Sequence, residues 1–252
     1  MVPQNHPAIG RIERQRGFTL IEIAVAVLVI TLLLSSILVP LTTQIEQRQF
    51  AEAEKRLAEV KEALIGFAAI NGYFPCPAFS ATIGTENRTA GACTDDGSGN
   101  PTRTGFLPWI TLGITPLDPW GNLYRYSVDP DFADANALFS LADQGDILIR
   151  TRDSAGVAVN LTNASPREIP VVVLSHGRNA HGATGEGGNV RAVPAGWGTG
   201  LDEYENATSE IDYWIRTRTG NVAAAGGEFD DIVAWISPNV LMARMVAAGR
   251  LP

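Results

Sequence analysis

The sequence of 252 residues has few lysines and no excess of basic charge. Lys55 and Lys61 are its two lysines, and 19 basic against 27 acidic residues give a net charge of −8. Because affinity for a nucleic-acid backbone comes mainly from clustered lysine and arginine, this balance argues against nucleic acid as a partner. Apolar residues make up 45% of the chain, which excludes a disordered polymer and predicts a folded core.

Cysteine and histidine are also scarce. The two cysteines, Cys76 and Cys93, are too few for a disulfide-dense scaffold or a four-cysteine zinc site. In an exported protein we expect them to form a disulfide, and two separate buried thiols are the alternative. His176 and His181 lie in a glycine-rich segment without a clear third ligand, so this segment predicts a surface turn rather than a zinc site.

A long uncharged segment follows a basic N-terminus. Three arginines lie within residues 1–17, and no residue from Ile23 to Ile45 is ionisable. A helix of this length can cross the roughly 30 Å hydrocarbon layer of a membrane. The positive-inside rule then predicts a cytoplasmic leader over 1–17, a transmembrane helix over 18–42 and an extracytoplasmic remainder.

One carboxylate, Glu22, lies near the start of this apolar segment, where an ionisable group is costly in lipid and needs a partner. The string Gly17-Phe18-Thr19-Leu20-Ile21-Glu22 before an apolar helix resembles the N-terminal signal of type IV pilins and type II secretion pseudopilins. The resemblance implies a prepilin peptidase as a partner, which cleaves after Gly17 and methylates the new amino group of Phe18. It also implies that Glu22 pairs with the N-terminal ammonium of a neighbouring subunit. An uncleaved signal anchor is the alternative.

The helical pattern continues beyond the apolar segment, as an amphipathic helix over 43–71. Apolar residues recur there at spacings of three or four, with charged residues between them. These residues are Phe50, Ala53, Leu57, Val60, Leu64 and Phe67. Asn71-Gly72 ends the helix, and the apolar stripe predicts contact with a sheet that follows.

The remaining residues, 72–252, predict a globular α+β head. Residues 72–104 predict a loop, and short segments rich in branched or aromatic side chains then predict strands. The predicted strands are 146–151, 169–175, 213–218 and 232–236, and the predicted closing helix is 240–248. The fold class is therefore α+β, with a long N-terminal helix packed on a small antiparallel sheet, as in pilins.

The string Asp118-Pro119-Trp120-Gly121-Asn122 predicts a turn, and Tyr124, Tyr126 and Val128 alternate as on one face of a strand. The string is similar to the one that opens the sheet of major type II pseudopilins. This second resemblance lies far along the chain from the first, and it favours a pilin-like head.

A third resemblance concerns calcium. Major pseudopilins bind calcium through Ser-x-Gly-x-Asp and a later pair of acids, which implies a site formed by Ser175, Asn179, Asp230 and Asp231. Here Asn179 replaces the acid, and a solvated turn or capping of backbone donors is the alternative role of the acid pair. Three further acids are expected to form a solvated face: Glu203, Glu205 and Glu210.

The sequence as a whole predicts a pseudopilin, a structural filament subunit of a type II secretion or related system. No convergent catalytic set is recognisable, so we do not expect an enzyme. The expected location is the bacterial inner membrane, crossed once, with a periplasmic head and with other pilin or pseudopilin subunits as partners. The alternatives are a minor type IV pilus or DNA-uptake pilin, and a membrane-anchored periplasmic binding protein or enzyme.

Overall fold

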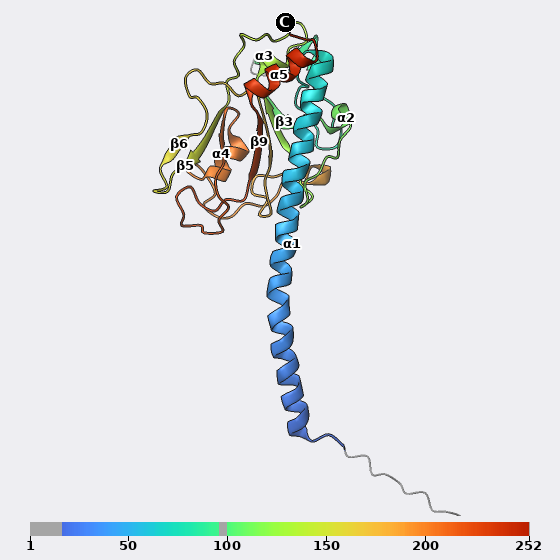
Figure 1. Cartoon of the computed structure of the whole chain (residues 1–252), viewed down its shortest axis with the longest axis vertical. Coiled ribbons are helices and arrows are strands. Elements are labelled where there is room, and N and C mark those ends of the chain that lie inside the picture. Colours follow the sequence, from blue (N-terminus) through green and yellow to red (C-terminus); the bar gives the residue numbers. More distant parts are fainter. Residues whose placement is uncertain (1–16, 96–99, 252) are drawn as a thin grey trace, which may run out of the picture. The chain divides into compact units, whose positions relative to one another are not determined.

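The computed structural model describes residues 17–95 and 100–251, and within this range it leaves out the side chains of residues 34–42. The predicted leader therefore lies outside the described residues except for Gly17. The chain divides into two compact units, residues 1–47 and 48–252. The sheets and the short helices all belong to the second unit (Figure 1).

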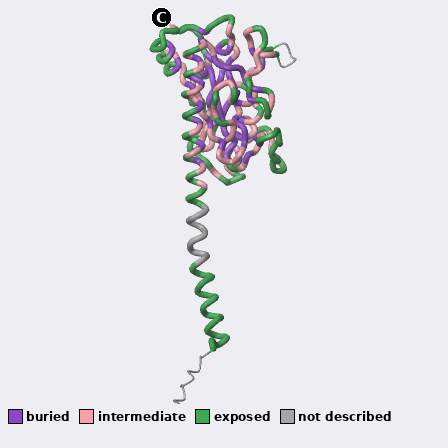
Figure 2. The backbone as a smooth tube through the Cα atoms, turned by 90° about the vertical axis from the view of Figure 1, so that its right-hand side faces the viewer, coloured by how far each residue is buried: buried purple, intermediate pink, exposed green. Residues whose placement is uncertain are grey.

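The longest element is helix α1, Leu20–Asn71, which confirms the predicted long N-terminal helix and runs through Pro40. It ends before Gly72, whose φ of 88° is a left-handed conformation that glycine adopts easily. The apolar residues from Leu20 to Leu33 are exposed, as the colour of the backbone shows (Figure 2).

Within the described part of the chain, none of the helices combines the length and the hydropathy that a membrane crossing requires. The transmembrane segment over 18–42 stays a prediction.

The part of α1 that belongs to the second unit buries the predicted apolar stripe except for Phe67, which is half-buried. Phe50, Ala53, Leu57, Val60 and Leu64 are all buried. The residues of α1 that belong to the main hydrophobic core are Leu57, Val60, Leu64, Ile65 and Ala68. The sequence pattern therefore identified the face of α1 that packs on the head.

Four strands form the main sheet in the order β3-β4-β7-β9, and each neighbouring pair is antiparallel. They are β3 (Thr104–Phe106), β4 (Arg125–Val128), β7 (Val171–Ser175) and β9 (Ile232–Ile236). In the register of the sheet, Val173 of β7 lies opposite Tyr126 of β4 and Ala234 of β9. The strands predicted over 169–175 and 232–236 are thus confirmed.

Strand β7 is covered on both faces. Val171 and Val173 belong to the core that includes the α1 residues, whereas Val172 and Leu174 belong to a second core on the other side of the sheet. A strand covered on both sides needs no alternation of apolar and polar residues, which explains the continuous Val-Val-Val-Leu run. The sheet is therefore the middle layer of the second unit.

A three-stranded sheet contributes to the second core, in the order β6-β5-β8. Its strands are β5 (Leu148–Arg152), β6 (Ala158–Asn160) and β8 (Asp212–Trp214). β5 and β6 are antiparallel, as the predicted sheet is, but β5 and β8 pair in parallel, which the sequence did not indicate. β8 is also shorter than the strand predicted over 213–218.

Short elements complete the second unit. They are the hairpin strands β1 (Arg88–Thr89) and β2 (Ala92–Cys93), the helices α2 (Trp109–Leu112), α3 (Pro130–Ala133), α4 (Asp202–Thr208) and α5 (Pro238–Ala247), and the 3₁₀ turn η1 (Glu186–Gly188). Helix α5 confirms the predicted closing helix, and its Leu241 and Met245 enter the main core. Helix α4 was not predicted.

The segment 72–104 is held by a disulfide and by an arginine. Cys76 and Cys93 form the predicted disulfide, and both are buried. The guanidinium of Arg88 donates hydrogen bonds to three main-chain oxygens, including that of Ala133 beyond the segment. The predicted loop is therefore tied to the rest of the head.

Replacement of both cysteines by alanine should lower the free energy of unfolding by about 3 kcal/mol, because the unfolded chain regains the freedom of the closed loop. Urea unfolding of the purified protein, followed by tryptophan fluorescence, measures this change. Reductant should shift the wild-type midpoint toward that of the variant and leave the variant unchanged. Equal midpoints for the two oxidised proteins would contradict a stabilising role.

Asp129 is a buried carboxylate at the start of α3, where its Oδ1 accepts a hydrogen bond of 2.9 Å from the Asp131 amide. Burial, and next the charge of Asp146, raise the pKa of Asp129 to about 7. A folded-state pKa above the unfolded value of about 4 means that the folded state binds the proton more tightly. Stability from this group is therefore complete in acid and is lost as the pH rises through the folded pKa.

The variant Asp129→Asn keeps the helix cap but carries no charge. Its free energy of unfolding should exceed that of the wild type by about 1–2 kcal/mol near pH 8, and this advantage should vanish near pH 4. Urea unfolding across this pH range provides the measurement. An advantage that does not change with pH would show that ionised Asp129 carries no penalty.

Candidate functional site

The N-terminal signal residues are open to solvent. Phe18 is 79% exposed, and no other described residue lies within 4 Å of the position that a Cβ on Gly17 would take. Residues 17–19 precede the first turn of α1, which begins at Leu20. The Gly17–Phe18 bond thus lies outside the helix, where an enzyme can reach its backbone.

Glu22 has a partner within its own chain. Its Oε2 accepts a hydrogen bond of 3.4 Å from the amide of Thr19, and the Thr19 Oγ1 accepts one of 3.3 Å from the amide of Glu22. This reciprocal pair is a capping box, which satisfies amides that have no partner in the first turn of a helix. The Thr-x-x-Glu spacing is visible in the sequence, but the sequence analysis missed this local role of Glu22.

In the head, the register of the sheet brings together residues that lie far apart in the sequence. Ser175 at the end of β7 lies opposite Ile232 at the start of β9, so the turn after β7 meets Asp230 and Asp231. The Oδ2 of Asp230 accepts hydrogen bonds from the amides of Arg178 and Asn179, at 3.1 and 2.9 Å. Asp230 thus caps backbone donors, whereas Oδ2 of Asp231 accepts a hydrogen bond from the side chain of Asn206.

Glycine is required in this turn. Gly177 has a φ of 61°, and a Cβ at this position would lie 2.1 Å from Oδ1 of Asp230. Any other side chain would therefore push the carboxylate of Asp230 away from the turn.

Two of the four predicted calcium ligands are occupied by other contacts. Ser175 Oγ donates a hydrogen bond of 2.6 Å to Oδ2 of Asp118, whose Oδ1 accepts from the amides of Trp120 and Asn122. The Asn179 Oδ1 accepts a hydrogen bond from the amide of His181. The aspartate of the Asp-Pro-Trp-Gly-Asn string thus anchors the end of β7.

Each of the other two predicted ligands has one oxygen that accepts no hydrogen bond within the described part of the chain, although Nδ1 of His176 lies 3.8 Å from Oδ1 of Asp231. Oδ1 of Asp230 and Oδ1 of Asp231 are buried and have no hydrogen-bond partner among the described residues. Glu203 completes the cluster, because one carboxylate oxygen from each of the three residues lies within 4.8 Å of the others. Buried carboxylate oxygens that converge in this way fit a hard divalent cation such as calcium.

The carboxylates of this cluster are poorly stabilised as anions. Burial raises the pKa of Glu203 to about 7 and that of Asp230 to about 6. The pKa of Asp231 also lies well above its usual value, because of burial and then the charge of Glu203. A bound cation would favour the ionised forms of all three side chains.

The acidic face expected at Glu203, Glu205 and Glu210 is a wrong prediction for Glu203. This side chain is buried in α4, where its two oxygens accept hydrogen bonds from Nδ2 of Asn179. Glu205 is half-buried and Glu210 is exposed. The expected surface turn is also wrong for Ser175 and His176, because both are buried.

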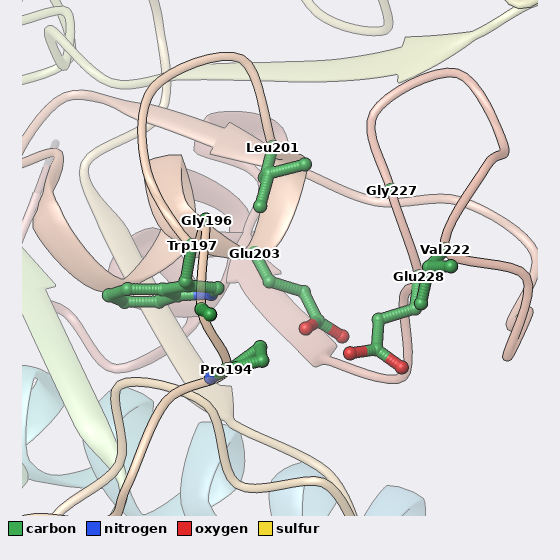
Figure 3. A pocket seen from close by; sticks show the side chains of 9 residues that line it. Pro194, Gly196, Trp197, Leu201, Glu203, Val222, Gly227 and Glu228 are labelled. Atoms are coloured by element: carbon green, nitrogen blue, oxygen red, sulfur yellow. The ribbon is translucent and has the colours of Figure 1, made fainter.

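Beside this cluster lies a cavity of about 300 Å³ (Figure 3). Its lining residues are Pro194, Ala195, Gly196, Trp197, Leu201, Glu203, Val222, Gly227 and Glu228. The carboxylates of Glu203 and Glu228 point toward each other at one side of the cavity (Figure 3). The cavity therefore combines apolar walls with two converging acids.

Comparison with known proteins finds one matching family motif and two similar proteins. Residues 13–38 match the family described as prokaryotic N-terminal methylation motif. The chain is 29% identical over 132 residues to the type II secretion system core protein G of Pseudomonas aeruginosa, covering 52% of this chain and 86% of that protein. It is 27% identical over 135 residues to the protein of the same name from Escherichia coli K12, covering 54% and 86%.

No solved structure matches the chain closely enough to add a comparison of folds. The methylation motif, the two relatives and the long helix packed on an antiparallel sheet agree with one another. In these respects the chain is similar to type IV pilin-like proteins and type II secretion pseudopilins.

Proposed function

We propose that the chain is a pseudopilin of a type II secretion system or a related one. In this proposal a prepilin peptidase cleaves after Gly17 and methylates the amino group of Phe18. The observation that carries the proposal is an exposed, non-helical Gly17–Phe18 junction directly before a helix whose apolar side chains are exposed. The methylation motif over residues 13–38 supports the same processing step.

The proposed role is mechanical rather than enzymatic. The exposed apolar side chains of residues 18–33 would pack against those of neighbouring subunits, so that their burial holds the filament together. Before assembly the same residues would sit in the inner membrane as part of a single span over 18–42, with the head in the periplasm. The partners are then the peptidase, the membrane and other pilin or pseudopilin subunits.

Glu22 supplies the register of this assembly. In a filament core of low dielectric constant, its carboxylate would pair with the N-terminal ammonium of the neighbouring subunit's Phe18. The capping box within the chain is a competing role for the same side chain. The two roles differ in what they need: the ion pair needs charge, and the cap needs a hydrogen-bond acceptor.

Two variants separate these roles. Glu22→Gln keeps a capping acceptor but loses the charge, whereas Thr19→Ala keeps the charge but loses the cap. We expect Glu22→Gln to reduce incorporation into filaments at least about tenfold, because it leaves a buried ammonium without a counter-charge. Thr19→Ala should assemble nearly as the wild type does. The measurement is the ratio of filament-borne to membrane-borne subunit in the producing cells.

Mass spectrometry of the membrane-borne subunit serves as the control, because both variants should be cleaved and methylated at Phe18. Normal assembly of Glu22→Gln would refute the ion-pair role. Retention of residues 1–17 in the wild type would refute the processing proposal itself.

We also propose that the head binds calcium between Asp230 and Asp231. Two buried carboxylate oxygens without a hydrogen-bond partner among the described residues support this proposal, and Glu203 takes the place of the acid that Asn179 lacks. Ser175 would act indirectly, by anchoring the turn through Asp118.

Calcium at about 100 times its dissociation constant should stabilise the purified protein by roughly 3 kcal/mol, which raises its melting temperature. Asp231→Asn should lose most of this increase. In the presence of a chelator it should be at least as stable as the wild type, because it removes a buried charge. Glu210→Gln, at an exposed acid, is the matched control and should respond as the wild type does. An equal response of Asp231→Asn would exclude Asp231 as a ligand.

A further inference from the structure

Glu203 also belongs to a second cluster of side chains of the types that bind metals, and this cluster lies next to the cavity. The Nδ1 of His181 lies 3.3 Å from Oε2 of Glu203 and 3.4 Å from Oε1 of Glu228. One ligand atom from each of the three residues lies within 4.8 Å of the other two. An imidazole and two carboxylates from three separate segments therefore converge on one point.

The spacing of these atoms suits a small tetrahedral cation. Ligand atoms bound at about 2.0–2.1 Å to one tetrahedral zinc ion lie about 3.3 Å apart. Both distances from the imidazole nitrogen are close to this value. Calcium, in contrast, takes six to eight oxygen ligands, so an imidazole in the ligand set favours a cation of the zinc class.

The charge of the cluster also calls for a cation. Two carboxylates share one imidazole, and the Glu203 side chain is only 2% exposed. A divalent cation would neutralise the two carboxylates in a site largely withdrawn from water.

The three residues come from different parts of the fold. His181 follows the turn after β7, Glu203 lies in α4, and Glu228 precedes β9. The remaining position around the cation would face the cavity, whose walls include Trp197 and Val222 (Figure 3). A cation held here would cross-link the three segments and keep one position for water.

We propose that His181, Glu203 and Glu228 form a binding site for a zinc-class divalent cation, with its fourth position open to the cavity. The site is distinct from the calcium site proposed between Asp230 and Asp231, although Glu203 contributes to both. Oε2 of Glu203 lies toward His181, whereas Oε1 accepts a hydrogen bond from the amide of Asp230.

The test is a titration of the purified full-length protein with zinc chloride in the presence of saturating calcium, followed by calorimetry. One zinc per chain is expected. Cobalt substitution should give the intense visible absorption of a tetrahedral site with a nitrogen ligand. His181→Gln and Glu228→Gln should each weaken zinc binding at least about tenfold.

Two controls make the result specific. Glu210→Gln changes an exposed acid close to α4 and should bind zinc as the wild type does. Circular dichroism without metal checks that the variants fold. Glu228→Gln is the safer variant in this respect, because the Glu228 side chain is 27% exposed.

Absence of one-to-one zinc binding would overturn the proposal, and so would unchanged affinity in both His181→Gln and Glu228→Gln. The calcium response should persist in His181→Gln, because the His181 imidazole belongs only to the zinc cluster. Failure of this proposal is therefore distinguishable from failure of the calcium proposal and of the filament role.

Discussion

The buried face of α1 between Phe50 and Ala68 packs against one side of the four-stranded sheet, and the rest of the second unit is arranged around this contact. Each fully buried leucine in it contributes about 2 kcal/mol of transfer free energy. Because the other side of the sheet is covered as well, β7 is fixed between two cores. The turn that follows β7 and the acids that precede β9 are thereby held in one place, since Ser175 lies opposite Ile232.

Local patterns in the sequence predicted the local parts of this fold. The spacing of apolar residues predicted the buried face of α1, and the runs at β7 and β9 predicted strands, because each signal lies within one element. Helix α4 gave no such signal, since it is seven residues long. The burial of Glu203 could not be predicted, because its partners Asn179 and Asp230 lie far from it in the sequence.

For the candidate calcium site, the sequence predicted some of the clustered residues and missed others. The resemblance to pseudopilins identified Asp230 and Asp231, and the structure brings these two residues to the turn after β7. It also implied Ser175 and Asn179, whose side-chain oxygens form other hydrogen bonds. Glu203 lies between the resulting acidic cluster and the imidazole of His181, so one buried carboxylate links two sets of polar groups.

Helix α5 has a consequence for the order in which the head folds. Leu241 and Met245 are buried in the same core as Leu57 and Leu64, and Arg250 donates a hydrogen bond to the carbonyl of Ala69. The ribosome makes the two leucines early and α5 late. The main core therefore lacks Leu241 and Met245 until α5 has been synthesised. A chaperone that shields the early apolar face would act within this interval.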